Sequence, residues 1–108
     1  MSRNLEVKCV CVNDKNKPIK IDESRWVKKD NEYSITHIYY HPNQGIQGVE
    51  LKEVKLLEKD APFEAYRLDR FGIYIDQLDK LKELIKLCTD LNDFDIEELI
   101  KKEVYADT

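Results

Sequence analysis

Two cysteines and two histidines at short, regular spacings are the residues best suited to binding a metal ion. One residue separates Cys9 from Cys11, and three separate His37 from His41. Structural zinc needs four such ligands in a tetrahedron, each within about 2.3 Å of the ion. In an extended strand, residues four apart are separated by about 13 Å and residues two apart by about 6.6 Å. We therefore expect thiols packed in a core, with no metal site.

A thiol nucleophile paired with a histidine base is a second chemistry that these residue types could support. Such a thiol needs a lowered pKa and a nearby base. Cys88 falls on the apolar face of a predicted helix and Cys9 in a predicted core strand, where burial raises the pKa of a thiol. The glycines, Gly45, Gly48 and Gly72, form no phosphate-binding loop. We expect no catalysis and no cofactor.

Aromatic and cationic side chains offer a third chemistry, the binding of a nucleotide. The chain has six tyrosines and one tryptophan, more large rings than a small core needs. Rings beside arginines could stack a base and hold its phosphate. The residues that we expect to contact such a ligand are Arg25, Tyr40, Arg67 and Arg70. The simpler interpretation is that the tyrosines fill the core, with Trp26 as its plug.

The net charge of −4 is unevenly distributed along the chain. Residues 1–30 carry eight Lys/Arg and five Asp/Glu, a balance of +3, whereas residues 76–108 carry five and ten, a balance of −5. A basic first third favours anionic ligands. A solvated surface with uneven charge explains the same pattern.

Length and composition indicate one small domain that spans residues 1–108. Hydrophobic residues make up 42% of the chain and charged residues 37%, which is typical of a globular protein. No apolar run approaches the length of a membrane span, and three cysteines do not suit a disulfide framework. We therefore expect a cytoplasmic protein. Because so small a domain has only a modest core, we also expect a homo-oligomer.

The elements that must position these residues are predicted to be strands in residues 1–75 and helices in residues 76–108. Alternating and β-branched runs predict strands at 5–12, 33–41 and 49–52, and one or two short strands within 66–75. A turn is predicted at 42–45, and a bulge or a bend between 52 and 54, after which the third strand continues at 54–56. Five or so short strands favour a small antiparallel β-barrel.

Helical spacing of apolar residues predicts two helices, at 77–90 and 96–105, which form a hairpin over one open side of the barrel. The expected end signals are an N-cap at Asp76, a capping box of Asp95 and Glu98, and a hydrophobic staple of Phe94 and Leu99. The predicted fold class is therefore α+β.

Several short motifs resemble those of small uncharacterised proteins of bacteriophages and mobile elements. The motifs are Cys11-Val12-Asn13-Asp14, Pro18, Ile21, Trp26-Val27-Lys28-Lys29, Tyr33-Ser34-Ile35-Thr36, Gly48-Val49-Glu50-Leu51, Ala61-Pro62-Phe63-Glu64 and Arg70-Phe71. The resemblance implies an SH3-like barrel followed by a helical tail. It brings no established activity, and the class includes inhibitors of host defence and small-molecule sponges. Where many such proteins have glycine, this chain has Asp30.

These observations favour a non-catalytic host-interaction protein, acting against host defence, that binds and sequesters a small nucleotide-derived molecule. The main alternative is an inhibitor or adaptor that binds a host protein through barrel edges or acidic helices. A nucleic-acid-binding accessory protein is a second alternative, which the isoelectric point of about 5.2 disfavours.

Overall fold

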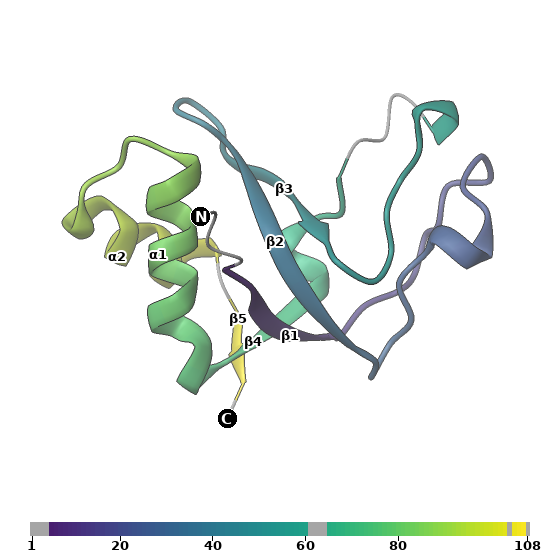
Figure 1. Cartoon of the computed structure of the whole chain (residues 1–108), viewed down its shortest axis with the longest axis horizontal. Coiled ribbons are helices and arrows are strands. Elements are labelled where there is room, and N and C mark those ends of the chain that lie inside the picture. The colour runs from purple at the N-terminus through teal and green to yellow at the C-terminus, as the bar shows by residue number, and fades with distance from the viewer. Residues whose placement is uncertain (1–4, 61–64, 104, 108) are drawn as a thin grey trace.

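Five strands form one open sheet in the order β3-β2-β1-β4-β5 (Figure 1). The structure, a computed structural model, describes residues 5–60, 65–103 and 105–107. The strands are β1 (Val7–Cys11), β2 (Glu32–His41), β3 (Gly45–Leu51), β4 (Phe71–Tyr74) and β5 (Tyr105–Asp107). The first four pair antiparallel, and β5 lies parallel to β4 at one edge. The α+β class is confirmed, whereas closure of the predicted barrel is not seen.

Strand β1 lies in the middle of the sheet because its residues alternate between the core and the other face. Val7, Cys9 and Cys11 are fully buried, and Lys8 between them is exposed. Cys9 stands opposite Tyr33 of β2 on one side and Ile73 of β4 on the other. The two closely spaced cysteines are therefore core residues.

The β2–β3 hairpin contains the irregularities that bend the sheet. Its pairing register shifts between Ile35 and His37 and again between Tyr39 and Tyr40. The bulge or bend predicted between residues 52 and 54 is present as a bend at residues 52–53, directly after β3 ends at Leu51. The predicted turn at 42–45 is confirmed, and it closes at Gly45, whose φ of 81° favours glycine.

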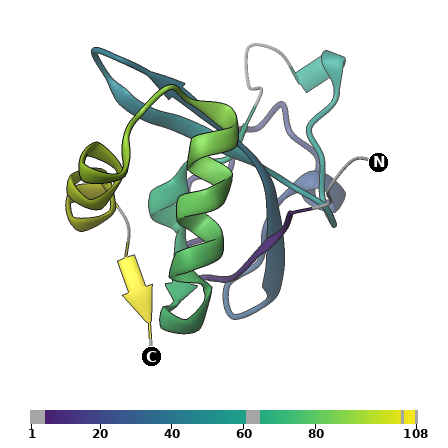
Figure 2. The same cartoon turned by 60° about the vertical axis from the view of Figure 1, so that its left-hand side comes forward.

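Helix α1 (Leu78–Cys88) packs against β2 and β1, and α2 (Asp93–Glu103) lies beside α1 (Figure 2). Helix α1 buries Leu81, Leu84 and Ile85, three residues of its predicted apolar face. An ion pair between Lys82 and Glu97 joins the two helices. The predicted helical hairpin is therefore present, although its ends differ from the prediction.

The predicted caps of both helices are wrong. Asp76 lies within a 3₁₀ turn, Ile75–Gln77, and α1 begins after Gln77. Helix α2 begins at residue 93, where the Asn92 side chain accepts a hydrogen bond of 2.9 Å from the Asp95 N–H. Phe94 is 73% exposed, so it forms no staple. At its other end α2 stops at residue 103 because residues 105–107 pair with β4 as β5.

The core is one cluster of buried side chains from the sheet, the loops and both helices, and it includes the fully buried Phe71. The rings of Phe71 and Tyr33 meet edge to face with centroids 6.1 Å apart. The Tyr33 hydroxyl accepts a hydrogen bond of 2.8 Å from the Lys28 N–H, which ties the end of a long loop to this core. Trp26, predicted to plug the core, is only half-buried at its edge.

One further backbone contact extends the sheet beyond its named strands. Val49 of β3 and Tyr66 exchange two hydrogen bonds, Val49 N–H to Tyr66 O at 2.8 Å and Tyr66 N–H to Val49 O at 3.0 Å. After this bridge the chain forms a 3₁₀ turn, Leu68–Arg70, and enters β4. The segment 65–70 is thereby fixed beside β3. The preceding motif, residues 61–64, lies outside the described residues.

Candidate binding site

The long loop between β1 and β2, residues 12–31, is fixed at its base and near its tip. At the base, the Cys11 N–H donates to Asn31 O at 2.9 Å and the Asp30 N–H donates to Cys11 O at 2.7 Å. Near the tip, Lys17 Nζ donates to Ile21 O at 2.5 Å. Asp30 adopts a φ of 73°, a conformation that favours glycine. The loop therefore has a defined shape, and it extends away from the helices (Figure 1).

Trp26 joins this loop to the segment 65–70. Its indole N–H donates to Asp14 O at 2.8 Å, and its ring lies 5.9 Å from the Tyr66 ring at an angle of 56°. The guanidinium carbon of Arg70 lies 4.7 Å from the centroid of the Trp26 ring, a cation–π contact. The Tyr66 hydroxyl donates to Arg25 O at 2.6 Å. Two rings and one cation thus pack together across forty residues of sequence.

The two arginines of the segment 65–70 have different surroundings. Arg70 Nη1 donates to Asn13 O at 3.2 Å and to Lys15 O at 2.7 Å, so it clamps the loop to the segment. Arg67 Nη2 lies 2.7 Å from the Asp69 carboxylate, and the Arg67 side chain is 73% exposed. A guanidinium has five N–H donors, so Arg67 retains donors for a ligand.

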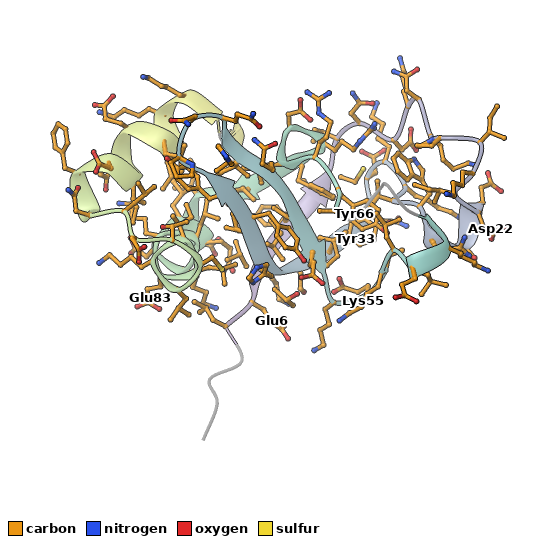
Figure 3. The ribbon with its side chains drawn as sticks, turned by 90° about the horizontal axis from the view of Figure 1, so that it is seen from above. Glu6, Asp22, Tyr33, Lys55, Tyr66 and Glu83 are labelled. Carbon is orange, nitrogen blue, oxygen red and sulfur yellow. The ribbon has the colours of Figure 1, made fainter. Side chains whose placement is uncertain are left out.

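A pocket of about 190 Å³ opens between the loop and the segment, and we call it the ring pocket. Its lining residues are Asn16, Pro18, Ile21, Trp26, Leu56, Ala65, Tyr66, Arg67 and Arg70. Figure 3 shows Tyr66 near the middle of the molecule and Asp22 of the loop at its far end. Pockets for drug-sized ligands measure about 300–1,000 Å³. The ring pocket therefore suits one flat ring, with the remainder of a ligand outside it.

The structure brings together two of the four predicted ligand-binding residues. Arg67 and Arg70 line the ring pocket. Arg25 lies beside it through its backbone carbonyl, which accepts the Tyr66 hydroxyl bond. Tyr40 lies on β2 opposite Ile46 and does not line this pocket. Arg67 is therefore the cation best placed to meet an anionic group of a ligand.

Sequence reasoning missed most of the pocket wall. Trp26 was assigned to the core, and the apolar wall residues Pro18, Ile21 and Leu56 received no role. The available signal was an aromatic residue next to an arginine in each of two segments, Arg25-Trp26 and Tyr66-Arg67. That signal does not reveal that the two segments meet.

The cysteines and histidines lie in different surroundings in the fold. Among the described residues, no group of three or more His, Cys, Asp or Glu side chains is placed to hold a metal ion. His37 instead lies beside α1, with its Nδ1 3.5 Å from the sulfur of Cys88. Burial raises the pKa of the Cys9 thiol to about 12, with a smaller contribution from the Glu53 carboxylate. Burial also raises the pKa of Cys11.

The pKa of Cys9 predicts a loss of stability in alkaline solution. The unfolded thiol ionises near its ordinary pKa of 9.0, whereas the folded thiol keeps its proton up to about 12. Between these two pH values the unfolded state therefore binds fewer protons than the folded state. The stability that the Cys9 thiol contributes is fully present below pH 9 and is lost as pH rises towards 12. We expect the urea midpoint to fall across this range, and to fall less steeply in Cys9→Ala. If the urea midpoint of Cys9→Ala falls with pH as steeply as that of wild type, other titrating groups cause the loss of stability.

Within the part of the chain that the structure describes, neither helix has the length and apolar character needed to cross a membrane. Comparison of the chain with protein-family models, with curated proteins and with solved structures finds no match.

Proposed function

We propose that this chain is a non-catalytic binding protein that sequesters a small nucleotide-derived molecule, with the ring of the ligand in the ring pocket and its phosphate on Arg67. A phage-type protein that removes a signal of host defence would act in this way. The observation that carries the proposal is the ring pocket itself, where Trp26 and Tyr66 lie beside two arginines.

The chemistry of the pocket supports a flat, anionic ligand. Aromatic side chains stack with any base because every base has a π-face, at about 1–3 kcal/mol per base. The loop 12–31 carries six Lys/Arg and four Asp/Glu, a balance of +2, which attracts a phosphate. Arg70 is held by two backbone carbonyls, so its main role is to shape the pocket.

Arg67→Ala tests the assignment of the phosphate. A hydrogen bond to a charged group contributes about 1.5–3 kcal/mol, so affinity for a bound nucleotide is expected to fall roughly 10- to 150-fold. Stability should change little, because the Arg67 side chain is exposed. Lys80→Ala, which removes one positive charge from the exposed side of α1, is the matched control.

Native mass spectrometry of protein purified from cells, followed by calorimetry with the nucleotide found, measures this effect. Wild-type affinity in both Arg67→Ala and Arg70→Ala would contradict the site.

The native mass spectrum also tests the expected homo-oligomer. The exposed side chains of Leu87 and Phe94, one on each helix, supply apolar surface for it.

A protein partner is the second candidate, favoured by apolar side chains around the same pocket. Ile19 is 100% exposed and Leu57 is 48% exposed, and each is next in sequence to a lining residue, Pro18 and Leu56. A large exposed apolar patch marks an interaction site, and we infer that these two side chains supply part of one. This candidate predicts a ligand-free mass and retention of a host protein that Ile19→Ser no longer retains.

We also propose that the fold is an SH3-like barrel in which residues 65–70 replace a full closing strand. The Val49–Tyr66 bridge and the 3₁₀ turn that leads into β4 support this assignment. An experimental structure in which residues 65–70 lie away from β3 would contradict it.

A further inference from the structure

A second pocket lies on the other side of Arg67, and we call it the anion pocket. It has a volume of about 310 Å³ and is lined by Ile46, Gln47, Arg67, Leu68, Asp69 and Lys102. Arg67 is common to its lining and to that of the ring pocket. The two pockets are therefore neighbours that share one cationic wall.

The anion pocket differs chemically from the ring pocket. None of the described residues that line it is aromatic, so these residues offer nothing on which a second base would stack. It does contain two cations, Arg67 and Lys102, against one carboxylate, Asp69, which is paired with Arg67. Within the described residues no carboxylate is paired with Lys102, and its side chain is exposed. Its ammonium group is a point charge suited to a phosphate.

We propose that the anion pocket holds the terminal phosphates of a nucleoside di- or triphosphate whose base occupies the ring pocket. This inference rests on the proposed function, and it specifies in addition that the ligand carries more than one phosphate. The first phosphate of any nucleotide in the ring pocket reaches Arg67. A second and a third phosphate lie beyond Arg67, towards Lys102. A monophosphate is too short to reach Lys102.

Binding of this kind needs no bond to be made or broken. The phosphate oxygens accept hydrogen bonds from the Arg67 guanidinium and the Lys102 ammonium, and the Gln47 amide adds a neutral donor. The Asp69 carboxylate repels the phosphates, so its neutral isostere is expected to tighten binding of the longer chains. The pocket therefore selects by charge and length of the ligand rather than by base.

The experiment compares mono-, di- and triphosphates of one nucleoside by calorimetry with wild type, Lys102→Ala and Lys101→Ala. Lys102→Ala is expected to weaken di- and triphosphate binding about tenfold, the equivalent of one charged hydrogen bond, and to leave monophosphate binding within about twofold. Lys101→Ala removes the same charge from the same helix turn outside the pocket, so its affinities should stay within about twofold of wild type.

Asp69→Asn is expected to raise triphosphate affinity severalfold while raising monophosphate affinity less, because a triphosphate places more negative charge near the carboxylate that the variant removes. Two failures are distinguishable. If mono-, di- and triphosphates bind wild type equally, or if the two lysine variants behave alike, the anion pocket is wrong while the ring pocket stands. If no nucleotide binds wild type, the proposed function is wrong, and this inference with it.

Discussion

Phe71→Ala is expected to lower the free energy of unfolding by about 3–5 kcal/mol, the usual range for truncating a buried phenylalanine. Phe71 is fully buried where β1 and β4 pair, opposite Cys11 and edge to face with Tyr33. Its removal leaves a cavity that neighbouring strands cannot fill without breaking their pairing. A domain of this size has a total stability of about 5–15 kcal/mol, so the variant keeps only part of it.

Urea denaturation followed by circular dichroism measures this loss. The control is Lys80→Ala, because the Lys80 side chain is exposed on α1 and its truncation should change the free energy by no more than about 0.5 kcal/mol. A loss below about 1 kcal/mol in Phe71→Ala would place that ring outside the core and contradict the described packing.

Gly48→Ala is expected to separate residues 65–66 from β3 and so to disrupt the ring pocket. A Cβ atom at residue 48 would lie 2.7 Å from the Ala65 Cβ and 3.0 Å from the Tyr66 carbonyl oxygen. Both atoms belong to residues 65–66, and Tyr66 is hydrogen-bonded to Val49. Either residues 65–66 or β3 must therefore move. Overpacking of this kind costs about 1–3 kcal/mol.

The movement also separates Tyr66 from Trp26, so two independent readouts are available. The urea midpoint is expected to fall, and tryptophan emission is expected to shift to longer wavelength as Trp26 gains water. Gln47→Ala, at the exposed neighbouring residue of β3, should leave both unchanged. Wild-type stability and emission in Gly48→Ala would show that residues 65–66 do not approach β3 this closely.

Local periodicity was sufficient to predict the elements that bury a regular face. Strand β1 was predicted from its alternation, and Leu81, Leu84 and Ile85 of α1 from their helical spacing. The ends of the helices could not be predicted in this way, because a neighbouring turn or strand determines where each helix begins or ends. A 3₁₀ turn precedes α1, and a parallel strand pair replaces the last predicted turn of α2.

The ring pocket was only half predictable for a different reason. Arg67 and Arg70 were identified by residue type, but their meeting with Trp26 depends on the bridge between Val49 and Tyr66. That bridge forms because Gly48 has no side chain to keep Ala65 away. A contact between segments forty residues apart leaves no periodic signal. Tyr40 lies near the last residue of β2, opposite Ile46, and so does not reach the ring pocket.

The most direct test of the proposed function uses Trp26, the single tryptophan of the chain, as a reporter inside the ring pocket. Its fluorescence is measured while nucleoside mono-, di- and triphosphates are added to wild type and to Arg67→Ala. The proposed function predicts saturable quenching in wild type at a concentration that rises at least tenfold in the variant, about 1.4 kcal/mol. A flat emission signal in wild type with every nucleotide, on protein that native mass spectrometry shows to be ligand-free, would contradict it.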